Sequence, residues 1–195
     1  MAASPSRLAD HIDVEGKLPR ALDALGAVAG RDVLLIGGGS LRAHQLAELG
    51  ARVAEIQRVP QTGRPDASAD VIVGLFSVFR GVDRRELAEV DRVLRPGGRL
   101  LVVHDYGRDD VSRLHDPALP EYGEWSRRDG PFLRGGFRIR VIHCWWTFAS
   151  LEEATGVLET ELGEAGRTLA ATMTRPRLSH NLAIYHRDRG GEPSA

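Results

Sequence analysis

Residues 32–40 read DVLLIGGGS, and this stretch decides the fold class of the chain. Its four consecutive apolar residues, 33–36, are typical of a short strand that is buried on both faces, as in a parallel sheet. The glycines at 37–39 predict a tight turn, because glycine has no Cβ and adopts backbone conformations that other residues avoid. Ser40 can cap a helix that begins at Leu41. The stretch therefore predicts a strand, a turn and a helix in succession.

The rest of the chain repeats this alternation of strands and helices. After a break at Gly50, ARVAEIQ (51–57) predicts a second strand, which completes a βαβ unit with a right-handed, parallel crossover. Further strands are expected at 71–76, 100–104, 138–146 and 181–186, and further helices at 17–25, 82–94, 110–114 and 150–162. The pattern predicts an α/β fold, a doubly wound and mostly parallel sheet with helices on both faces. In such sheets, ligands bind beyond the carboxyl ends of the strands.

The composition is that of one globular domain covering residues 1–195, with loose tails at 1–10 and 188–195. Hydrophobic residues make up 42% and charged residues 27%, which excludes an intrinsically disordered chain. The formal net charge of -1 gives no overall field toward nucleic acid or an anionic membrane, so neither is an expected partner. The single cysteine excludes an internal disulfide framework. No apolar run is long enough to span a bilayer and no secretory signal is visible, so we expect a cytoplasmic protein.

Four stretches carry a resemblance to a known family by their order and spacing: DVLLIGGGS (32–40), ARVAEIQ (51–57), PDASADVIVGLFSVF (65–79) and ELAEVDRVLRPGGRLLVVHDY (86–106). Together they resemble the class I S-adenosylmethionine-dependent methyltransferases, and the resemblance extends from Arg31 to Tyr106. Its most recognisable part is DRVLRPGGRLLVV (91–103), which looks like a helix, turn and strand of that family.

The resemblance implies a cofactor, S-adenosylmethionine, and transfer of its methyl group to an acceptor, for which a small molecule is the default. Family positions assign the cofactor to Gly37, Gly38, Gly39, Ser40, Glu55, Gln57, Ser77 and Phe79. The residues His104, Asp105 and Tyr106 would face the methyl group and the acceptor. The chemistry would be mainly orientation of the acceptor, with His104 or Tyr106 assisting proton removal.

Several positions depart from the family pattern. The family's acidic residue in the first strand falls on Leu35, and the third glycine of its turn falls on Leu41. Its ribose-binding acid falls on Gln57, which hydrogen-bonds a hydroxyl more weakly than a carboxylate does, with Glu55 as a substitute. Only residues 58–69 stand where the family has a helix and a further strand, so we expect that one helix and one strand are deleted.

The deletion would leave half of the implied cofactor pocket open. Three alternatives follow: a partner subunit closes the pocket, the cofactor binds weakly, or the ligand is smaller than this cofactor. An uncovered second strand would be an exposed sheet edge, which proteins usually protect, so we expect a homo-oligomer. The departures also favour an alternative function, a repurposed or non-catalytic protein of methyltransferase fold that acts as a partner or scaffold subunit.

Two clusters allow a functional and a structural interpretation. His104 has the residue type of a general base, yet it can equally pack into the sheet while Asp105 caps the next turn. In HCWW (143–146), the tryptophans could hold a flat or cationic acceptor, and Cys144 could be a nucleophile if its pKa were lowered, but a buried strand end is the favoured interpretation. The arginines within 127–140 could face an anionic substrate, RNA or solvent. No spacing of histidines or acids indicates a metal site.

Overall fold

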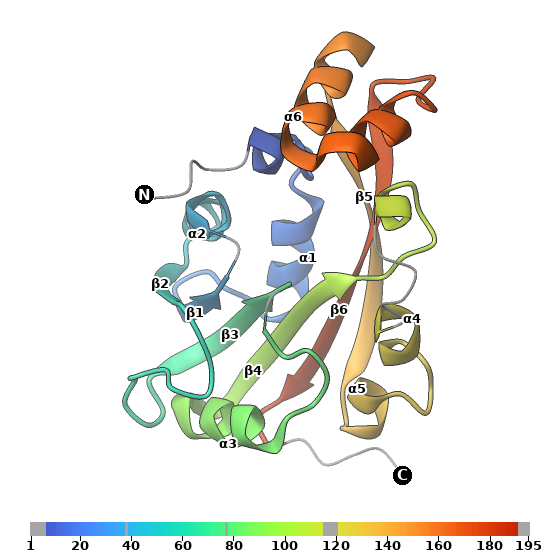
Figure 1. Ribbon diagram of the computed structural model, residues 1–195. Coiled ribbons are helices and arrows are strands. Elements are labelled where there is room, and N and C mark those ends of the chain that lie inside the picture. Colours follow the sequence, from blue (N-terminus) through green and yellow to red (C-terminus); the bar gives the residue numbers. More distant parts are fainter. Residues whose placement is uncertain (1–6, 38, 77, 115–120, 191–195) are drawn as a thin grey trace.

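A six-stranded sheet forms the centre of the structure, a computed structural model that describes residues 7–37, 39–76, 78–114 and 121–190 (Figure 1). The strands are β1 (Asp32–Ile36), β2 (Arg52–Ile56), β3 (Ala69–Leu75), β4 (Leu94–Asp105), β5 (Arg138–Thr147) and β6 (Arg177–Asp188). They lie in the order β2-β1-β3-β4-β6-β5. The strands β1 to β4 run parallel to one another, whereas β6 runs antiparallel to β4 and to β5. The predicted sheet is therefore confirmed.

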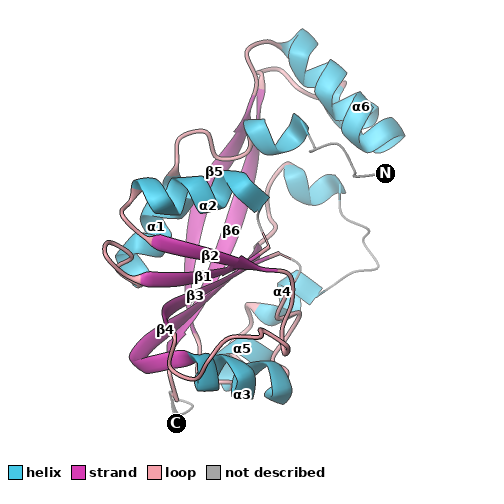
Figure 2. Cartoon of the chain, turned by 90° about the vertical axis from the view of Figure 1, so that its left-hand side faces the viewer, coloured by secondary structure: helices cyan, strands magenta, loops and turns pink. Residues whose placement is uncertain are grey.

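Helices cover both faces of this sheet, as predicted (Figure 2). They are α1 (Lys17–Leu25), α2 (Gly39–Glu48), α3 (Arg84–Val93), α4 (Glu121–Trp125), α5 (Pro131–Arg134) and α6 (Leu151–Ala170), with 3-10 turns η1 (Arg7–His11) and η2 (Val111–Leu114). The helices α1 and α2 lie on one face, and α3, α4 and α5 lie on the other. The helix α6 stands beyond the sheet, at the end of the long strands β5 and β6 (Figure 1).

Strand β1 shows how its sequence leads to this layered arrangement. Val33 and Leu35 belong to the core that α1 and α2 cover, whereas Leu34 and Ile36 belong to the core on the side of α3. All four side chains are buried. Because successive side chains of a strand point to opposite faces, a strand buried on both faces needs a continuous apolar run, which is what this segment has.

Several elements begin or end at residues other than those expected. The helix α2 begins at Gly39, so Ser40 lies in its first turn and not at its cap. The expected turn at 95–98 lies inside β4, where Gly97 has a φ of 76° and the register against β3 shifts. The helix α6 is longer than expected, because a second helical segment follows a kink at Gly163.

The expected loose tails are partly ordered. Asp188 is the last residue of β6, and the backbone N–H of Arg189 donates to the carbonyl of Gly98 at 2.9 Å. Near the other terminus, residues 7–10 belong to η1. These segments are ordered because their backbone groups find hydrogen-bond partners, and the rest of both predicted tails lies outside the described residues.

The connection between β2 and β3 contains neither a helix nor a strand. Residues 57–68 form a loop, and all of them are described. Within the described part of the chain, β2 pairs with β1 alone, so it forms one edge of the sheet. The expected loss of one helix and one strand is confirmed.

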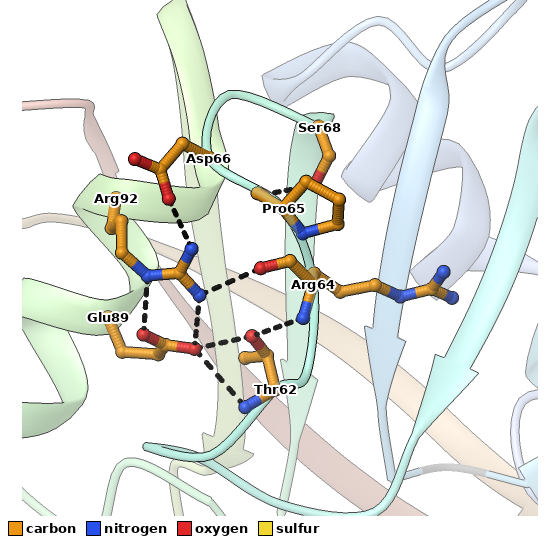
Figure 3. A network of polar contacts seen from close by, with 7 residues as sticks. All are labelled: Thr62, Arg64, Pro65, Asp66, Ser68, Glu89 and Arg92. Atoms are coloured by element: carbon orange, nitrogen blue, oxygen red, sulfur yellow. Dashed lines mark hydrogen bonds and ion pairs between the residues drawn. The ribbon is translucent and has the colours of Figure 1, made fainter.

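Two charged side chains of α3 hold this loop in place (Figure 3). Glu89 accepts hydrogen bonds from the backbone N–H and the hydroxyl of Thr62. Arg92 donates to Glu89 at 2.8 Å, to the carbonyl of Arg64 at 2.9 Å and to the carboxylate of Asp66. Hydrogen bonding to Arg92 lowers the pKa of Glu89 to about 2, so this carboxylate is ionised at neutral pH. A clamp of two side chains thus replaces the missing helix and strand as the support of this connection.

Candidate functional site

The carboxyl ends of β1 and β2 lie side by side. Their register pairs Ile36 with Ile56, so the next residues, Gly37 and Gln57, are neighbours at this edge of the sheet. Gly37 and Gly39 have φ values of 78° and 64°, which residues with a side chain rarely adopt. A Cβ built on Gly39 would meet no atom within 4 Å. The turn therefore opens onto free space at the N-terminus of α2, where backbone N–H groups can bind polar ligand atoms.

Polar side chains line the same edge beside the turn. Ser40, Glu55 and Gln57 are all exposed. Glu55 pairs with Leu35 in the sheet. Leu35, which stands where the family has an acidic residue in its first strand, is fully buried and is part of the core. Leu41 is 36% exposed and does not fill the turn from within. The structure therefore brings the glycine turn and both candidate ribose-binding residues together, while Gly38 lies outside the described residues.

Phe79, which the resemblance assigns to the cofactor, is a core residue. Its side chain is 1% exposed and belongs to the core cluster on the side of α3. A Cβ on Gly74 in β3 would meet the ring of Phe79 at 3.0 Å and the side chain of Val78 at 2.8 Å. The ring thus packs across the end of β3, because Gly74 leaves room for it, and it offers no open face to a ligand. Ser77 lies outside the described residues.

His104, the expected general base, is enclosed. It has no exposed surface, its ring centroid lies 4.6 Å from that of Trp125, and its Nε2 lies 3.0 Å from the carbonyl oxygen of Phe79. Burial lowers the pKa of this imidazole, so the ring is neutral at physiological pH. A general base must lie within hydrogen-bond reach of its substrate. The structural interpretation, packing in the sheet, therefore describes His104 as it stands here.

Asp105 contacts a histidine of β6, a contact that neither interpretation of this cluster included. His180 Nε2 lies 2.7 Å from Asp105 Oδ1, and the indole N–H of Trp146 donates to His180 Nδ1 at 3.0 Å. Because the indole nitrogen can only donate, Nδ1 must accept, and the proton of His180 sits on Nε2, directed at the carboxylate. Both nitrogens of this buried imidazole are therefore engaged, and the trio orients the end of β4 against β6.

Tyr106 follows β4 and is the least enclosed of the three expected acceptor-facing residues by its contacts. Its backbone N–H donates to the carbonyl of Asn181 at 2.9 Å, which holds the residue beside β6. Its ring is half-buried, and the guanidinium carbon of Arg108 lies 5.7 Å from the ring centroid. Tyr106 also packs against the core on the side of α3, so its half-buried ring lies at the margin of that core.

The β5–β6 ribbon extends past the edge at which β4 ends. The last pair between β4 and β6 is Asp105 with Leu182, yet β6 begins five residues earlier, at Arg177, and β5 accompanies it to Thr147. Figure 1 shows the ribbon rising above the carboxyl edge and carrying α6 at its end. The candidate site is therefore framed by the β1–α2 turn on one side and by this ribbon on the other.

A buried ion pair joins the two sides of this frame. Asp13, which precedes α1, lies 3.8 Å from the guanidinium of Arg42 in α2, and its backbone N–H donates to the carbonyl of Trp145 in β5 at 2.9 Å. Both charged side chains are buried. The sequence analysis missed this pair and missed the role of His180. No local signal marks them, because each pairs with residues that are distant along the chain.

Cys144 and Trp146 follow the structural interpretation, whereas Trp145 is half-buried and lies outside the core clusters. Cys144 is 1% exposed, and burial together with the nearby carboxylate of Asp13 raises the pKa of its thiol to about 12, so it is no nucleophile at neutral pH. Trp146 is buried and bonded to His180. The ring of Trp145 is covered by Arg177, whose guanidinium carbon lies 4.4 Å from the ring centroid.

A metal-ion cluster and a membrane-spanning helix are both absent from the residues that the structure describes. No group of three or more histidine, cysteine or acidic side chains in that part of the chain is placed to hold a metal ion. None of the helices described there is both long and apolar enough to cross a membrane.

Comparisons of the chain with known proteins link it to methyltransferases through structure. No protein-family model and no curated protein matches the sequence. Among solved structures, a candidate type II methyltransferase from Anaeromyxobacter dehalogenans is 21% identical, with a TM-score of 0.54 over 88% of this chain and 94% of that chain. A SAM-dependent methyltransferase from Aquifex aeolicus is 19% identical, with a TM-score of 0.51 over 94% and 93%. A complex between the Haloferax volcanii Trm112 methyltransferase activator and a candidate methyltransferase contains a chain that is 15% identical, with a TM-score of 0.51 over 88% and 89%.

These similarities agree with the features described above. The alignments cover nearly the full lengths of these similar structures. The sheet of the present chain has the strand order β2-β1-β3-β4-β6-β5, with an antiparallel β6 and a glycine turn after β1. The fold that the sequence resemblance implied is confirmed. This chain therefore has the α/β fold of these methyltransferase structures.

Proposed function

We propose that this protein transfers a methyl group from S-adenosylmethionine to a small-molecule acceptor. One observation carries the proposal: the glycine turn between β1 and α2 opens onto free space, directly beside the exposed polar side chains at the end of β2. The fold supports methyl transfer in general, and the cofactor and the small acceptor are the specific parts of the proposal.

The residues at this edge fit two parts of the cofactor. The backbone of Gly37 and Gly39 would lie against the methionine part, because the space beyond Gly39 is unfilled. The carboxylate of Glu55 and the amide of Gln57 would bind the ribose hydroxyls. When bound, the cofactor supplies a methyl group on a positively charged sulfur. The task of the chain is then to hold the acceptor in line with that methyl group, which is chiefly an effect of orientation.

On the acceptor side, Tyr106 is the residue that we place nearest the acceptor. His104 and Phe79 are enclosed, so we give them a supporting role in the packing beneath the site. Asp105 supports the site through its contact with His180, which fixes β4 against the β5–β6 ribbon. An acceptor whose nucleophilic atom is already unprotonated at neutral pH would suit this edge, because His104 is enclosed and out of reach of an acceptor as a general base.

Thermal unfolding with and without S-adenosylmethionine, and with its demethylated product, tests the proposal. A ligand present at 100 times its dissociation constant stabilises the folded chain by about 2.7 kcal/mol. For a chain of this size, that corresponds to a rise in Tm of roughly 5–10 °C. We expect a saturable rise of this order with both compounds, followed by detection of methylated product in a screen of small acceptors.

Two exposed glutamines provide a matched pair of variants for this experiment. Gln57→Ala removes the amide beside the turn, and we expect the dissociation constant of the cofactor to rise about tenfold, the equivalent of about 1.4 kcal/mol. Gln61→Ala removes the same group from the 57–68 loop and should leave binding unchanged, because Gln61 is exposed away from the turn. Absence of any Tm shift at millimolar cofactor, with the wild-type chain folded, would refute the proposal.

A second candidate function has specific support in the structure. The cofactor edge has Gln57 in place of an acid, and only the 57–68 loop stands where a helix and a strand are absent. These features favour a repurposed fold that acts as a partner or scaffold subunit. One of the similar structures is a complex of a methyltransferase with an activator, which is consistent with such a role. Stable capture of a partner chain by a protein that shows no cofactor-dependent Tm shift would favour this candidate.

We further propose that the chain forms a homo-oligomer through the β2 edge. The unpaired backbone groups of an edge strand are a ready template for association, and proteins usually cover or charge such edges. In the described residues, β2 has a partner on one side only. The second copy would then take the place of the deleted strand.

A further inference from the structure

A pocket lies on the part of the β5–β6 ribbon that extends past β4. Its volume is about 250 Å³, and its walls come from η2, from β5 and β6, and from the turn that joins α6 to β6. The residues that carry charge or aromatic character there are Asp110, Arg113, Trp145, Arg175 and Arg177. None of these residues belongs to the cofactor edge described above.

The pocket holds three arginines against one carboxylate. That carboxylate, Asp110, is already engaged: it accepts hydrogen bonds from the backbone N–H and the hydroxyl of Ser179 at 3.0 and 2.7 Å, and its other oxygen lies 3.6 Å from Arg113. Within the described part of the chain, Arg175 and Arg177 form no ion pair. Two guanidinium groups therefore share one small pocket without a compensating negative charge.

The positions of these arginines are set by contacts around them. The guanidinium of Arg177 stacks on the ring of Trp145 at 4.4 Å, which fixes its plane and leaves its N–H edge free to donate. The backbone N–H of Arg177 donates to the carbonyl of Arg175 at 2.8 Å, so the two residues form one tight turn. The carbonyl of Pro176, between them, accepts from the backbone N–H of Phe148 at 2.9 Å, which ties this turn to β5.

A pre-arranged cationic donor, here the stacked guanidinium of Arg177, lowers the ordering cost of binding an anion, because less side-chain freedom is lost when the ligand arrives. A guanidinium group also matches the geometry of phosphate and carboxylate oxygens through parallel N–H donors. The remaining walls include the apolar side chains of Met173 and Leu178, beside Trp145. These walls suit the organic part of a small ligand.

We propose that this pocket binds a small organic anion, with its phosphate or carboxylate group held by Arg175 and Arg177 and its organic part against Trp145. The site goes beyond the proposed methyl transfer, because binding there requires no cofactor. Inorganic phosphate alone would bind more weakly, since it fills only the charged end of the pocket.

Titration calorimetry with three probes tests this site and separates the two kinds of anion. The probes are phenyl phosphate, benzoate and inorganic phosphate, each added to the full chain without cofactor. We expect saturable binding of phenyl phosphate or benzoate, tighter than that of inorganic phosphate. The affinity should fall as salt rises from 50 to about 300 mM, because the attraction between exposed charges is screened at high ionic strength. The stronger of the two aromatic probes identifies the anionic group.

Three single-residue variants decide whether the pocket is responsible. Arg175→Ala should weaken binding of the better probe at least tenfold without lowering Tm, because Arg175 is exposed and its side chain forms no ion pair within the described part of the chain. Arg177→Lys keeps the charge but loses the stacked plane, so it should weaken binding by a smaller factor. Arg128→Ala removes an exposed guanidinium from another loop and should leave the affinity unchanged. Equal affinities in the Arg175 and Arg128 variants, or no binding of any probe at 10 mM, would overturn the proposal.

Discussion

Asp13 shows how a single side chain can join three parts of this molecule. Its two carboxylate oxygens accept from the backbone N–H groups of Lys17 and Leu18, at 3.0 and 2.8 Å, and so satisfy the first turn of α1. The same carboxylate faces Arg42 of α2, and the backbone N–H of Asp13 bonds β5. Asp13 is 1% exposed and has a φ of 52°, a conformation that asparagine and aspartate tolerate better than most residues.

Replacing this residue should therefore destabilise the fold strongly. We expect Asp13→Ala to lower the free energy of unfolding by about 3 kcal/mol, because it leaves a buried guanidinium and two helix N–H groups without their partner. Asp13→Asn should cost less, since its amide oxygen still accepts one hydrogen bond and the residue tolerates positive φ. Glu15→Ala, at a partly exposed neighbouring carboxylate, should change stability by less than about 0.5 kcal/mol. Urea unfolding of the three variants measures this, and similar values for Asp13→Ala and Glu15→Ala would contradict the assigned role.

At the scale of elements, the 57–68 loop depends on α3 for its position. The loop lacks the backbone ladder of a helix or strand, and its contacts with Glu89 and Arg92 take over that support (Figure 3). Arg92 is the centre of the network, because it reaches a carboxylate on its own helix as well as a carboxylate and a carbonyl of the loop. The loop in turn borders a hollow of about 290 Å³ over the amino ends of β1 and β2.

Removal of Arg92 should release this loop while leaving the core intact. We expect Arg92→Ala to lower the free energy of unfolding by less than removal of a buried network would, because Arg92 is partly exposed and solvent screens its ion pairs. Trypsin should then cut after Arg58 faster than in the wild type, since cleavage requires a locally open chain. Arg85→Ala, an exposed arginine of the same helix, is the control. Unchanged cleavage of the loop in Arg92→Ala would show that the clamp does not hold it.

The same clamp predicts a dependence of stability on pH. The pKa of Glu89 is about 2 in the folded chain and near 4.5 when unperturbed, so the unfolded state takes up the proton first as the pH falls. The contribution of Glu89 is therefore fully present above about 4.5 and disappears between about 4.5 and 2. Glu89→Gln should lose stability mainly above that window, and unfolding at pH 7 and pH 3 measures the difference between the two proteins. An equal difference at both pH values would argue against an ionised Glu89 in the folded state.

At the scale of the whole molecule, the sheet has one long edge strand, β5, and one short edge strand, β2. The ribbon of β5 and β6 extends far past β4 and carries α6, whereas β2 is a short strand with a free edge in the described part of the chain (Figures 1 and 2). The free edge of β2 follows from the deletion after that strand. It leaves the proposed cofactor site incomplete, and in our proposal a second copy placed at β2 would complete it.

Light scattering on the purified chain tests this arrangement. We expect the mass of a dimer or larger oligomer at micromolar concentration, and a shift to the monomer in Ala54→Lys, because a lysine at a sheet edge opposes association. Ala54 is half-buried beside the hollow over β2, whereas Ala88 is exposed on α3, so Ala88→Lys is the matched control. A monomeric wild-type chain at about 100 μM would contradict the proposed association.

The sequence by itself determined the class of the fold and one half of the candidate site. The continuous apolar run at 33–36, the glycines after it and the alternation of later strands with helices depend on local composition and on the backbone freedom of glycine. The deletion after β2 was equally readable, because a helix and a strand need more residues than 58–69 provide. Gln57 beside the turn follows from the same local order, since neighbouring parallel strands end at one edge.

Only the tertiary structure decided what the polar and aromatic side chains do. His104 and Phe79 had residue types and positions that suited a site, yet packing against Trp125 and Gly74 encloses them. The carboxylate of Asp105 forms a hydrogen bond with His180, which lies 75 residues away along the chain, and no sequence pattern near either residue indicates the pair. The reason is that burial, hydrogen-bond partners and the pKa shifts they cause depend on which distant segments meet. The packing of the entire core determines these tertiary contacts, whereas neighbouring residues determine the helix and strand patterns.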